Sequence, residues 1–319
     1  MNKERIQKAL ARQGVASRRH IEALITEGKL RLNGEIAVAG DQVSPGDVVM
    51  LEGKKIVIRD DDNQMPRVIA YHKPEGEICS RDDPQGRPTI FDKLPRIVHA
   101  RWVAIGRLDI NTAGLILLTD NGELANKLMH PSSQVEREYI VRTIGMASSA
   151  VMQQLVNKVD LEDGPARFET VDYVGGGEGV NHWYHVTILE GRNREVRRMW
   201  EAVGLKVSRL KRVRYGTVSL ASTHRQRAVK ELHEREVIGL ADSVGLQYSK
   251  EGAVKAVPRR SRSDVSGSTK TAKFSGKTPS KVAPDTRRTA SSKIGRITSD
   301  APPRPRAKQT KRRNERRAP

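Results

Sequence analysis

The apolar positions of the first sixty residues follow two helical repeats and then a strand-like repeat. The spacing of apolar residues predicts a helix over residues 3–13, which Gly14 would end. A second helix is predicted in the stretch SRRHIEALITEG, where Ser17 is a good N-cap and a glycine closes the stretch. Short alternating strands follow, and the Asn33-Gly34 pair is a hairpin signal. The pattern predicts a small module of helices and strands over residues 1–60.

From residue 67 onward, short apolar runs are mixed with helical stretches. The predicted strands lie in VIAYH, ARWVAIG, GLILLT, REYIVRT, WYHVTILEG and KVSRLKRVRYGTVSL, and the predicted helices in GELANKLMH and ASSAVMQQLVNKV. Strands and helices do not alternate as regular βαβ units, so we expect an α+β domain around a largely antiparallel or mixed sheet. We place this domain at residues 67–245, after a polar linker at 61–66.

The last part of the chain, residues 246–319, differs in composition from the rest. The net charge of the protein is +20, and residues 251–319 hold 20 Lys and Arg against 5 Asp and Glu. This segment is rich in Ser, Thr and Pro and almost without aromatic residues, so we expect a disordered basic tail. Such a tail suits binding to RNA phosphates, although a solubilising role is an alternative.

Cysteine content and hydropathy bear on the compartment. Cys79 is the only cysteine, which excludes an intrachain disulfide framework. The chain has no apolar run of about 18 residues and no secretory signal at the N-terminus. We therefore expect a cytoplasmic protein that does not bind a membrane.

The two predicted N-terminal helices carry a group of cations. Arg18 and Arg19 fall in the first turn of the second helix, where the helix dipole disfavours positive charge. With Lys8 and Arg12 they could form a phosphate-binding face, although an ordinary solvated helix surface is the alternative. The paired arginines, the glycine-terminated helix and the NG turn resemble the S4 RNA-binding module. That resemblance implies docking on structured RNA through shape and phosphates.

A single carboxylate stands out in the second domain. In GRLDINTAGLILLT, Asp109 lies in a polar loop between apolar runs that predict buried strand ends. The glycines are too far apart for a phosphate-binding loop, and no serine has the setting of a nucleophile elbow. The histidines are scattered, and the close pair in HWYH is expected to pack on a strand, so no metal site is predicted.

Two later stretches could complete a site around Asp109. VEREYIVR places Tyr139 on a predicted strand, and EGRNREVRRMW holds four arginines, at 192, 194, 197 and 198. An aspartate, an aromatic ring and an arginine can together hold one extruded base. Taken alone, a tyrosine such as Tyr139 is more often a core residue, and a stretch such as EVRR is more often an exposed basic helix turn.

The motifs GRLD with NTAGL, EREYIVR and EGRNREVRRMW, in this order, are similar to the signatures of pseudouridine synthases of the RsuA and RluB group. The resemblance implies that Asp109 is the nucleophile, Tyr139 stacks on the base and Arg197 pairs with Asp109. It also implies that Arg107 and Val196 lie beside the base, and we add Arg192 as a candidate RNA contact.

Within this group the chain looks most like the members that act on the large ribosomal subunit. The implied reaction is isomerisation of a uridine in 23S ribosomal RNA to pseudouridine, with uridine 2605 as the expected position. It needs no metal or cofactor. Ribosomal RNA is the expected partner, and we expect a monomer. The alternatives are a synthase acting on another ribosomal RNA site and a catalytically silent RNA-binding assembly factor.

Overall fold

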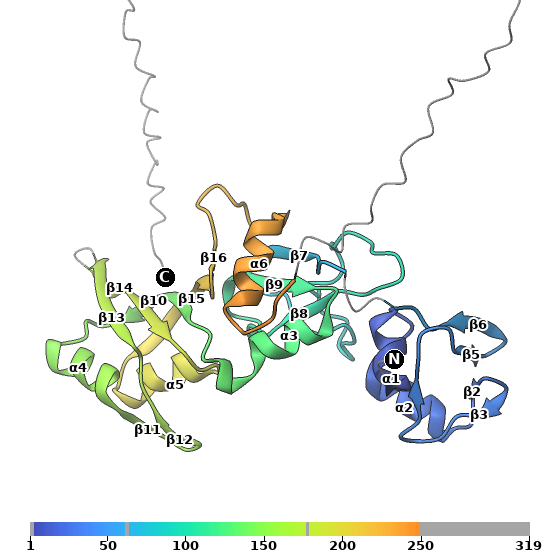
Figure 1. The fold of residues 1–319 in the computed structure, drawn as a ribbon. Helices are drawn as coiled ribbons and strands as arrows, with labels where there is room; N and C mark the ends of the chain where they lie inside the picture. The colour runs from blue at the N-terminus through green and yellow to red at the C-terminus, as the bar shows by residue number, and fades with distance from the viewer. Residues whose placement is uncertain (1–2, 61–63, 177–178, 249–319) are drawn as a thin grey trace, which may run out of the picture. The chain divides into compact units, whose positions relative to one another are not determined.

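The computed structural model describes residues 3–60, 64–176 and 179–248 (Figure 1). The predicted basic tail lies outside the described residues, apart from its first three positions, and so does half of the predicted linker.

The N-terminal module contains two helices and two small sheets. The helices are α1 (Ile6–Arg12) and α2 (Arg18–Thr26). One sheet pairs β1 (Glu4–Arg5) with β4 (Gln42–Val43), and the other has the order β3 (Glu35–Ile36), β2 (Leu30–Leu32), β5 (Val48–Leu51), β6 (Lys54–Val57).

Helix α2 begins where the sequence predicts, because the Ser17 side chain accepts a hydrogen bond from the His20 N–H at 3.1 Å. The predicted start of the first helix at residue 3 is wrong. Glu4–Arg5 forms a strand instead, because it pairs with Gln42–Val43 nearly forty residues later. The predicted turn at Asn33-Gly34 is confirmed, since both residues have positive φ between β2 and β3.

The second domain is built on one mixed sheet, which confirms the predicted α+β class. Its main path runs β13 (Thr170–Gly176), β14 (Asn181–Ile188), β10 (Arg137–Ile144), β15 (Lys206–Tyr215), β9 (Ala113–Thr119), β7 (Val68–Lys73), β17 (Val229–Glu231). Beside this path, β8 (Val103–Ile105) pairs with β9 and β16 (Val218–Ser219) pairs with β15. Among the described strand pairs of this sheet only β15 and β9 run parallel, and their two-residue contact joins the two halves of the sheet.

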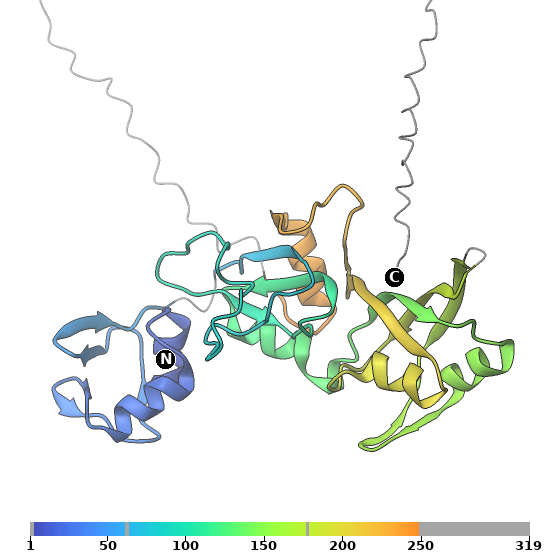
Figure 2. The same ribbon diagram turned by 180° about the vertical axis from the view of Figure 1, so that it is seen from behind.

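The faces of the sheet are covered unequally (Figures 1 and 2). On one face, α4 (Ser149–Asn157) and α5 (Glu195–Ala202) contribute Leu155, Met199 and Trp200 to a core with Val141 and Val186. On the opposite face, α3 (Gly122–Met129) and α6 (Glu234–Asp242) pack over β7 and β9. A short hairpin of β11 (Val159–Leu161) and β12 (Gly164–Ala166) lies beside α5, and the 3-10 turn η1 (Pro131–Ser133) precedes β10.

Candidate active site

The loop that carries Asp109 connects β8 to β9 at the junction of the two half-sheets. A turn within it is closed by the Thr112 N–H, which donates to the Asp109 carbonyl at 3.0 Å. Gly114 ends the loop with φ of 113°, and a Cβ at this position would lie 2.1 Å from the Arg212 carbonyl oxygen. Only glycine fits there, because β9 and β15 approach too closely for a side chain.

A buried lysine donates hydrogen bonds to the backbone of this loop. Lys73, at the end of β7, is 0% exposed, and its Nζ donates to the carbonyls of Pro74, Asp109 and Thr112 at 3.1, 3.0 and 2.8 Å. Burial lowers the pKa of Lys73, and the Cys79 and Glu77 side chains oppose that shift. The ammonium group thus fixes the backbone of Asp109 while the carboxylate stays about one-third exposed.

Cys79 supports the residue that precedes Asp109. Its Sγ lies 3.4 Å from both the N and the O of Leu108. Burial raises the pKa of the Cys79 thiol, which favours the neutral form. A neutral thiol can both donate to the carbonyl and accept from the N–H.

Asp109 lines a cleft of about 1010 Å³. Tyr139, which is 8% exposed, lines the same cleft together with Val196 and Arg107. Four residues predicted from far-apart stretches of sequence therefore meet at one cavity. A cleft of this volume can hold a flipped nucleotide and part of its neighbours, since ligand pockets commonly span roughly 300–1,000 Å³.

The cation that reaches Asp109 is Arg194, whose Nη1 lies 4.0 Å from the carboxylate Oδ2. Arg197 is 6% exposed and donates instead to the carbonyls of Val207 at 3.0 Å and Asn111 at 2.8 Å. Burial first, and the charge of Arg194 second, lower the pKa of Arg197, while Asp109 opposes that shift. A direct pair between Arg197 and Asp109 is not formed within the described part of the chain and stays a prediction.

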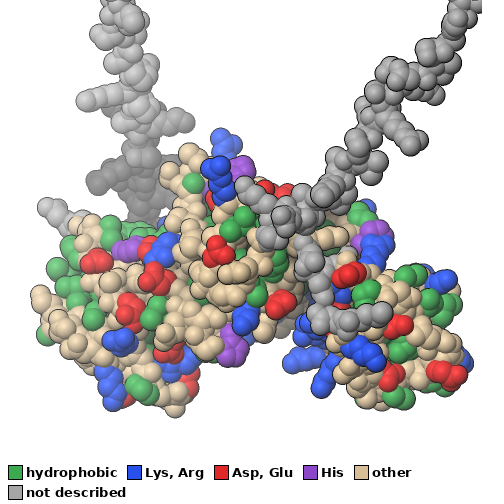
Figure 3. Space-filling model, in the orientation of Figure 1, with side chains coloured by type: hydrophobic (Ala, Val, Ile, Leu, Met, Phe, Trp, Pro, Cys, Tyr) green, Lys and Arg blue, Asp and Glu red, His purple; other side chains and the backbone are tan. Residues whose placement is uncertain are grey.

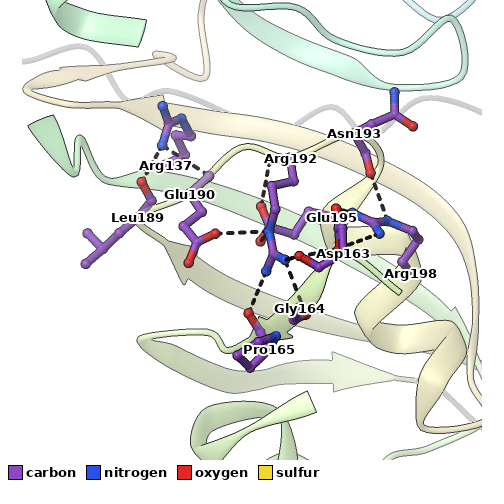
Figure 4. A network of polar contacts seen from close by, with 10 residues as sticks. All are labelled: Arg137, Asp163, Gly164, Pro165, Leu189, Glu190, Arg192, Asn193, Glu195 and Arg198. Atoms are coloured by element: carbon purple, nitrogen blue, oxygen red, sulfur yellow. Dashed lines mark hydrogen bonds and ion pairs between the residues drawn. The ribbon is translucent and has the colours of Figure 1, made fainter. Parts of the chain in front are cut away.

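Arg194 has an unusual backbone conformation, and its neighbours Asn193 and Glu195 belong to the network that Figure 4 shows. It is the N-cap of α5 with φ of 47°, a region that costs a non-glycine residue about 1 kcal/mol. The adjacent Arg198 binds both oxygens of Asp163 at 2.8 and 2.9 Å and also donates to the Asn193 carbonyl. Asp163 lies in the turn of the β11–β12 hairpin, so this hairpin supports the loop that presents Arg194.

Arg192 was predicted to contact RNA, but its guanidinium is engaged within the protein (Figure 4). It pairs with Glu190 at 3.0 Å, with Glu195 at 2.9 Å and with Asp163 at 3.1 Å. It also donates to the Pro165 carbonyl at 2.9 Å. A structural role therefore explains these contacts, and the role in RNA binding stays a prediction.

The cations predicted on the N-terminal module differ in their surroundings. Lys8 lies 3.4 Å from Glu4, and Arg12 also contacts that carboxylate. Arg18 and Arg19 are exposed in the first turn of α2, as the sequence predicts. Figure 3 shows Lys and Arg side chains gathered along the helical side of this module. RNA binding by these residues stays a prediction.

Two residues that shape the candidate site, Lys73 and Arg212, escaped the sequence analysis, and Arg194 appeared there only as one of four arginines. Lys73 could have been noticed as a lysine at the end of the apolar strand VIAYHK. Arg212 lines the cleft at 2% exposure and donates to the Leu115 carbonyl at 2.8 Å, and its Nη2 has no hydrogen-bond partner among the described residues. Nothing in RLKRVRYG distinguishes this arginine from its exposed neighbours.

Neither a metal cluster nor a membrane helix appears in the described ranges. No group of three or more His, Cys, Asp or Glu side chains there could hold a metal ion. His185 of the HWYH stretch instead lies 3.2 Å from Glu138 on the neighbouring strand. The described helices are also too short or too polar to span a bilayer.

Comparisons with known proteins agree with this architecture. The sequence profile of the RNA pseudouridylate synthase family matches residues 67–202, and that of the S4 domain matches residues 4–49. A solved structure described as a pseudouridylate synthase superposes with a TM-score of 0.53 at 26% identity, and covers 74% of this chain and 99% of its own.

Curated relatives are more similar in sequence. Ribosomal large subunit pseudouridine synthase B of Pseudomonas aeruginosa is 52% identical over 244 residues, which is 76% of this chain and 63% of that protein. The Escherichia coli K12 protein of the same name is 56% identical over 219 residues, or 68% of this chain and 75% of that protein. The chain thus spans about two thirds of the length of the relatives it matches.

Proposed function

Because this chain belongs to the pseudouridine synthase family and resembles proteins named ribosomal large subunit pseudouridine synthase B, we propose that it isomerises a uridine of 23S ribosomal RNA to pseudouridine. The observation that carries the proposal is the cleft in which Asp109, Tyr139 and Arg194 meet. The target position we propose is uridine 2605. We also propose that the catalytic domain comprises residues 67–245.

The target base would leave its RNA stack and enter the cleft, at a cost of a few kcal/mol for unstacking. Stacking on the ring of Tyr139 offsets part of that cost. Val196 and Arg107 would border the base, and Arg212 would offer its unpartnered Nη2 to an oxygen of the nucleotide. The N-terminal module would dock on neighbouring RNA through Arg18 and Arg19.

Asp109 acts as the nucleophile: its ionised carboxylate forms a covalent bond to the nucleotide, and that bond breaks again before the product leaves. The bond between N1 of uracil and C1′ of the ribose breaks, the uracil turns, and C5 bonds to C1′. C5 gives up its proton and N1 gains one, so the product is an isomer of the substrate. Arg194, and Arg197 behind it, would stabilise the anionic carboxylate before attack and on its release.

The proposal is tested by mapping pseudouridines in ribosomal RNA with carbodiimide treatment and primer extension. We expect one 23S pseudouridine to be lost without this protein, to return with the wild type, and to stay absent with Asp109→Asn. Asp160→Asn is the matched control, because this carboxylate is 76% exposed and bound to Lys158. If no site is lost, an RNA-binding assembly factor without catalysis becomes the better explanation.

A further inference from the structure

The sheet has a second face that the proposed reaction does not use. Strands β10, β14 and β15 present Tyr139 and Leu210 to the cleft, so their alternate residues point the other way. That opposite surface, which we call the reverse face, is formed by Glu138, Ile140, Arg142, Trp183, His185, Arg209, Lys211 and Arg214. Each of these residues is at least partly exposed.

The helices leave this part of the sheet open. α3 and α6 cover the same side of the sheet, but over β7 and β9. α4 and α5 lie on the other side of β10 and β14 in both ribbon views (Figures 1 and 2).

Three cations of the reverse face have no carboxylate partners within the described ranges, whereas His185 lies 3.2 Å from Glu138. Arg142, Arg209 and Lys211 are free of ion pairs there, whereas Arg214 at the far end of β15 pairs with Glu138 and Glu136. Arg142 and Arg209 stand directly opposite each other on paired strands. Like charges in that position destabilise a sheet, so their presence calls for a function.

An aromatic ring accompanies these cations. Trp183 is paired with Arg142 across β14 and β10, and the Arg142 guanidinium carbon lies 5.6 Å from the centre of the indole ring. The Arg142 Nε donates to the Ser208 hydroxyl at 2.9 Å, which fixes the side chain above the strand. Arginines beside an aromatic ring are the usual means of holding phosphates and stacking bases.

We propose that the reverse face is a second RNA-binding surface, which holds a segment of ribosomal RNA outside the target hairpin. RNA fits better than a protein partner, because three cations without carboxylate partners lie together on this surface and complement phosphates. The surface lies across the sheet from the cleft, so only an RNA longer than the target hairpin reaches both. The inference rests on the proposed function for the identity of the RNA.

The test uses the full chain and two labelled RNA probes. One is a short hairpin with the target uridine, and the other is a 23S fragment that extends this hairpin by its flanking helices. The variant combines Arg209→Glu with Lys211→Glu, two side chains without hydrogen-bond or ion-pair partners in the described structure. The control combines Lys158→Glu with Arg167→Glu, which changes net charge equally but replaces cations already paired with Asp160 and Glu169.

For the long fragment, we expect the variant to bind about tenfold more weakly. Its salt dependence should flatten by roughly 1.4–1.8 in the slope of log K against log salt, as for two lost phosphate contacts. Turnover and affinity for the short hairpin should equal those of the wild type, and the control should behave as the wild type with both probes.

The proposal would be overturned if variant and control lost affinity for the long fragment equally, or if the variant bound the long fragment as tightly as the wild type. If the variant also loses turnover on the hairpin, the Arg209→Gln and Lys211→Gln pair decides, because it removes charge without reversing it. Loss of turnover in that neutral pair as well would place these residues in the folding of the domain and refute a separate surface. Absence of hairpin turnover in the wild type would instead reject the proposed function.

Discussion

Replacing Lys73 by methionine should damage both stability and turnover, because one buried ammonium group holds the Asp109 loop. Three carbonyl oxygens accept from its Nζ within 3.1 Å. A hydrogen bond to a charged group contributes roughly 1.5–3 kcal/mol, but the burial of the charge offsets part of the sum. We therefore expect Lys73→Met to lower the free energy of unfolding by about 3–5 kcal/mol, because three buried carbonyl oxygens lose their donor at about 1–3 kcal/mol each and the relieved burial of the charge offsets part of that loss.

For a folded part of this size, that loss corresponds to a fall in the thermal midpoint of roughly 6–20 °C. Turnover should fall about a hundredfold or more in variant protein that is still folded, because misplacement of a reacting group by about 1 Å has that effect. RNA affinity should change little, since Lys73 is 0% exposed and cannot touch RNA.

Calorimetry, turnover on the target hairpin and RNA binding measure these three quantities separately. Lys158→Met is the control, because Lys158 is 61% exposed and should change stability by less than about 0.5 kcal/mol. A Lys73→Met protein with the wild-type midpoint and turnover would show that the loop is held by other contacts, and would refute this reasoning.

Two further substitutions, Gly114→Ala and Asp163→Asn, test the end of the Asp109 loop and the hairpin carboxylate that binds Arg198. In urea unfolding, Gly114→Ala should lower the free energy of unfolding by about 4 kcal/mol or more, because its Cβ would overlap the Arg212 backbone. Gly239→Ala in α6 is the comparison: no atom lies within 4 Å of its Cβ, so it should raise the free energy of unfolding by about 0.5–1 kcal/mol. Similar values for the two variants would contradict the close approach of β9 and β15. The hydrogen bond from Arg198 lowers the pKa of Asp163, so the stability that this carboxylate confers is present above the ordinary carboxyl range, near pH 4, and is lost as the pH falls through the lowered value. The thermal midpoints of wild type and Asp163→Asn should therefore differ at neutral pH and converge in acid, and a constant difference would exclude this linkage.

Elements whose signals are local could be predicted from the sequence. Helix α2 starts after Ser17, and α3 starts after Asn121, whose side chain accepts from two N–H groups at 2.9 Å. The cap and the apolar stripe of each helix lie within a dozen residues, so the sequence is sufficient. The strand at Glu4–Arg5 was missed because its partner strand lies far along the chain.

The same distinction between local and long-range signals applies to the candidate active site. Asp109 and Tyr139 belong to short motifs, and the structure brings both to one cleft. The partners of the arginines depend on tertiary contacts. Arg192 meets Asp163 across 29 positions, and Arg197 meets the Asn111 carbonyl across 86. A basic stretch alone cannot tell which of its guanidinium groups are used internally and which remain for the substrate.

The candidate site combines an anchored backbone at Asp109 with a partly exposed cation, Arg194. The backbone of Asp109 is held by Lys73, whereas Arg194 is 43% exposed and lies 4.0 Å from the carboxylate, beyond a normal hydrogen bond. We therefore expect Arg194 to approach a bound nucleotide without a change in the loop that carries Asp109. Since a preorganised group loses little freedom in the reaction, the reaction rate should depend on the anchoring of the Asp109 loop by Lys73. The affinity for the flipped base should depend on Arg194.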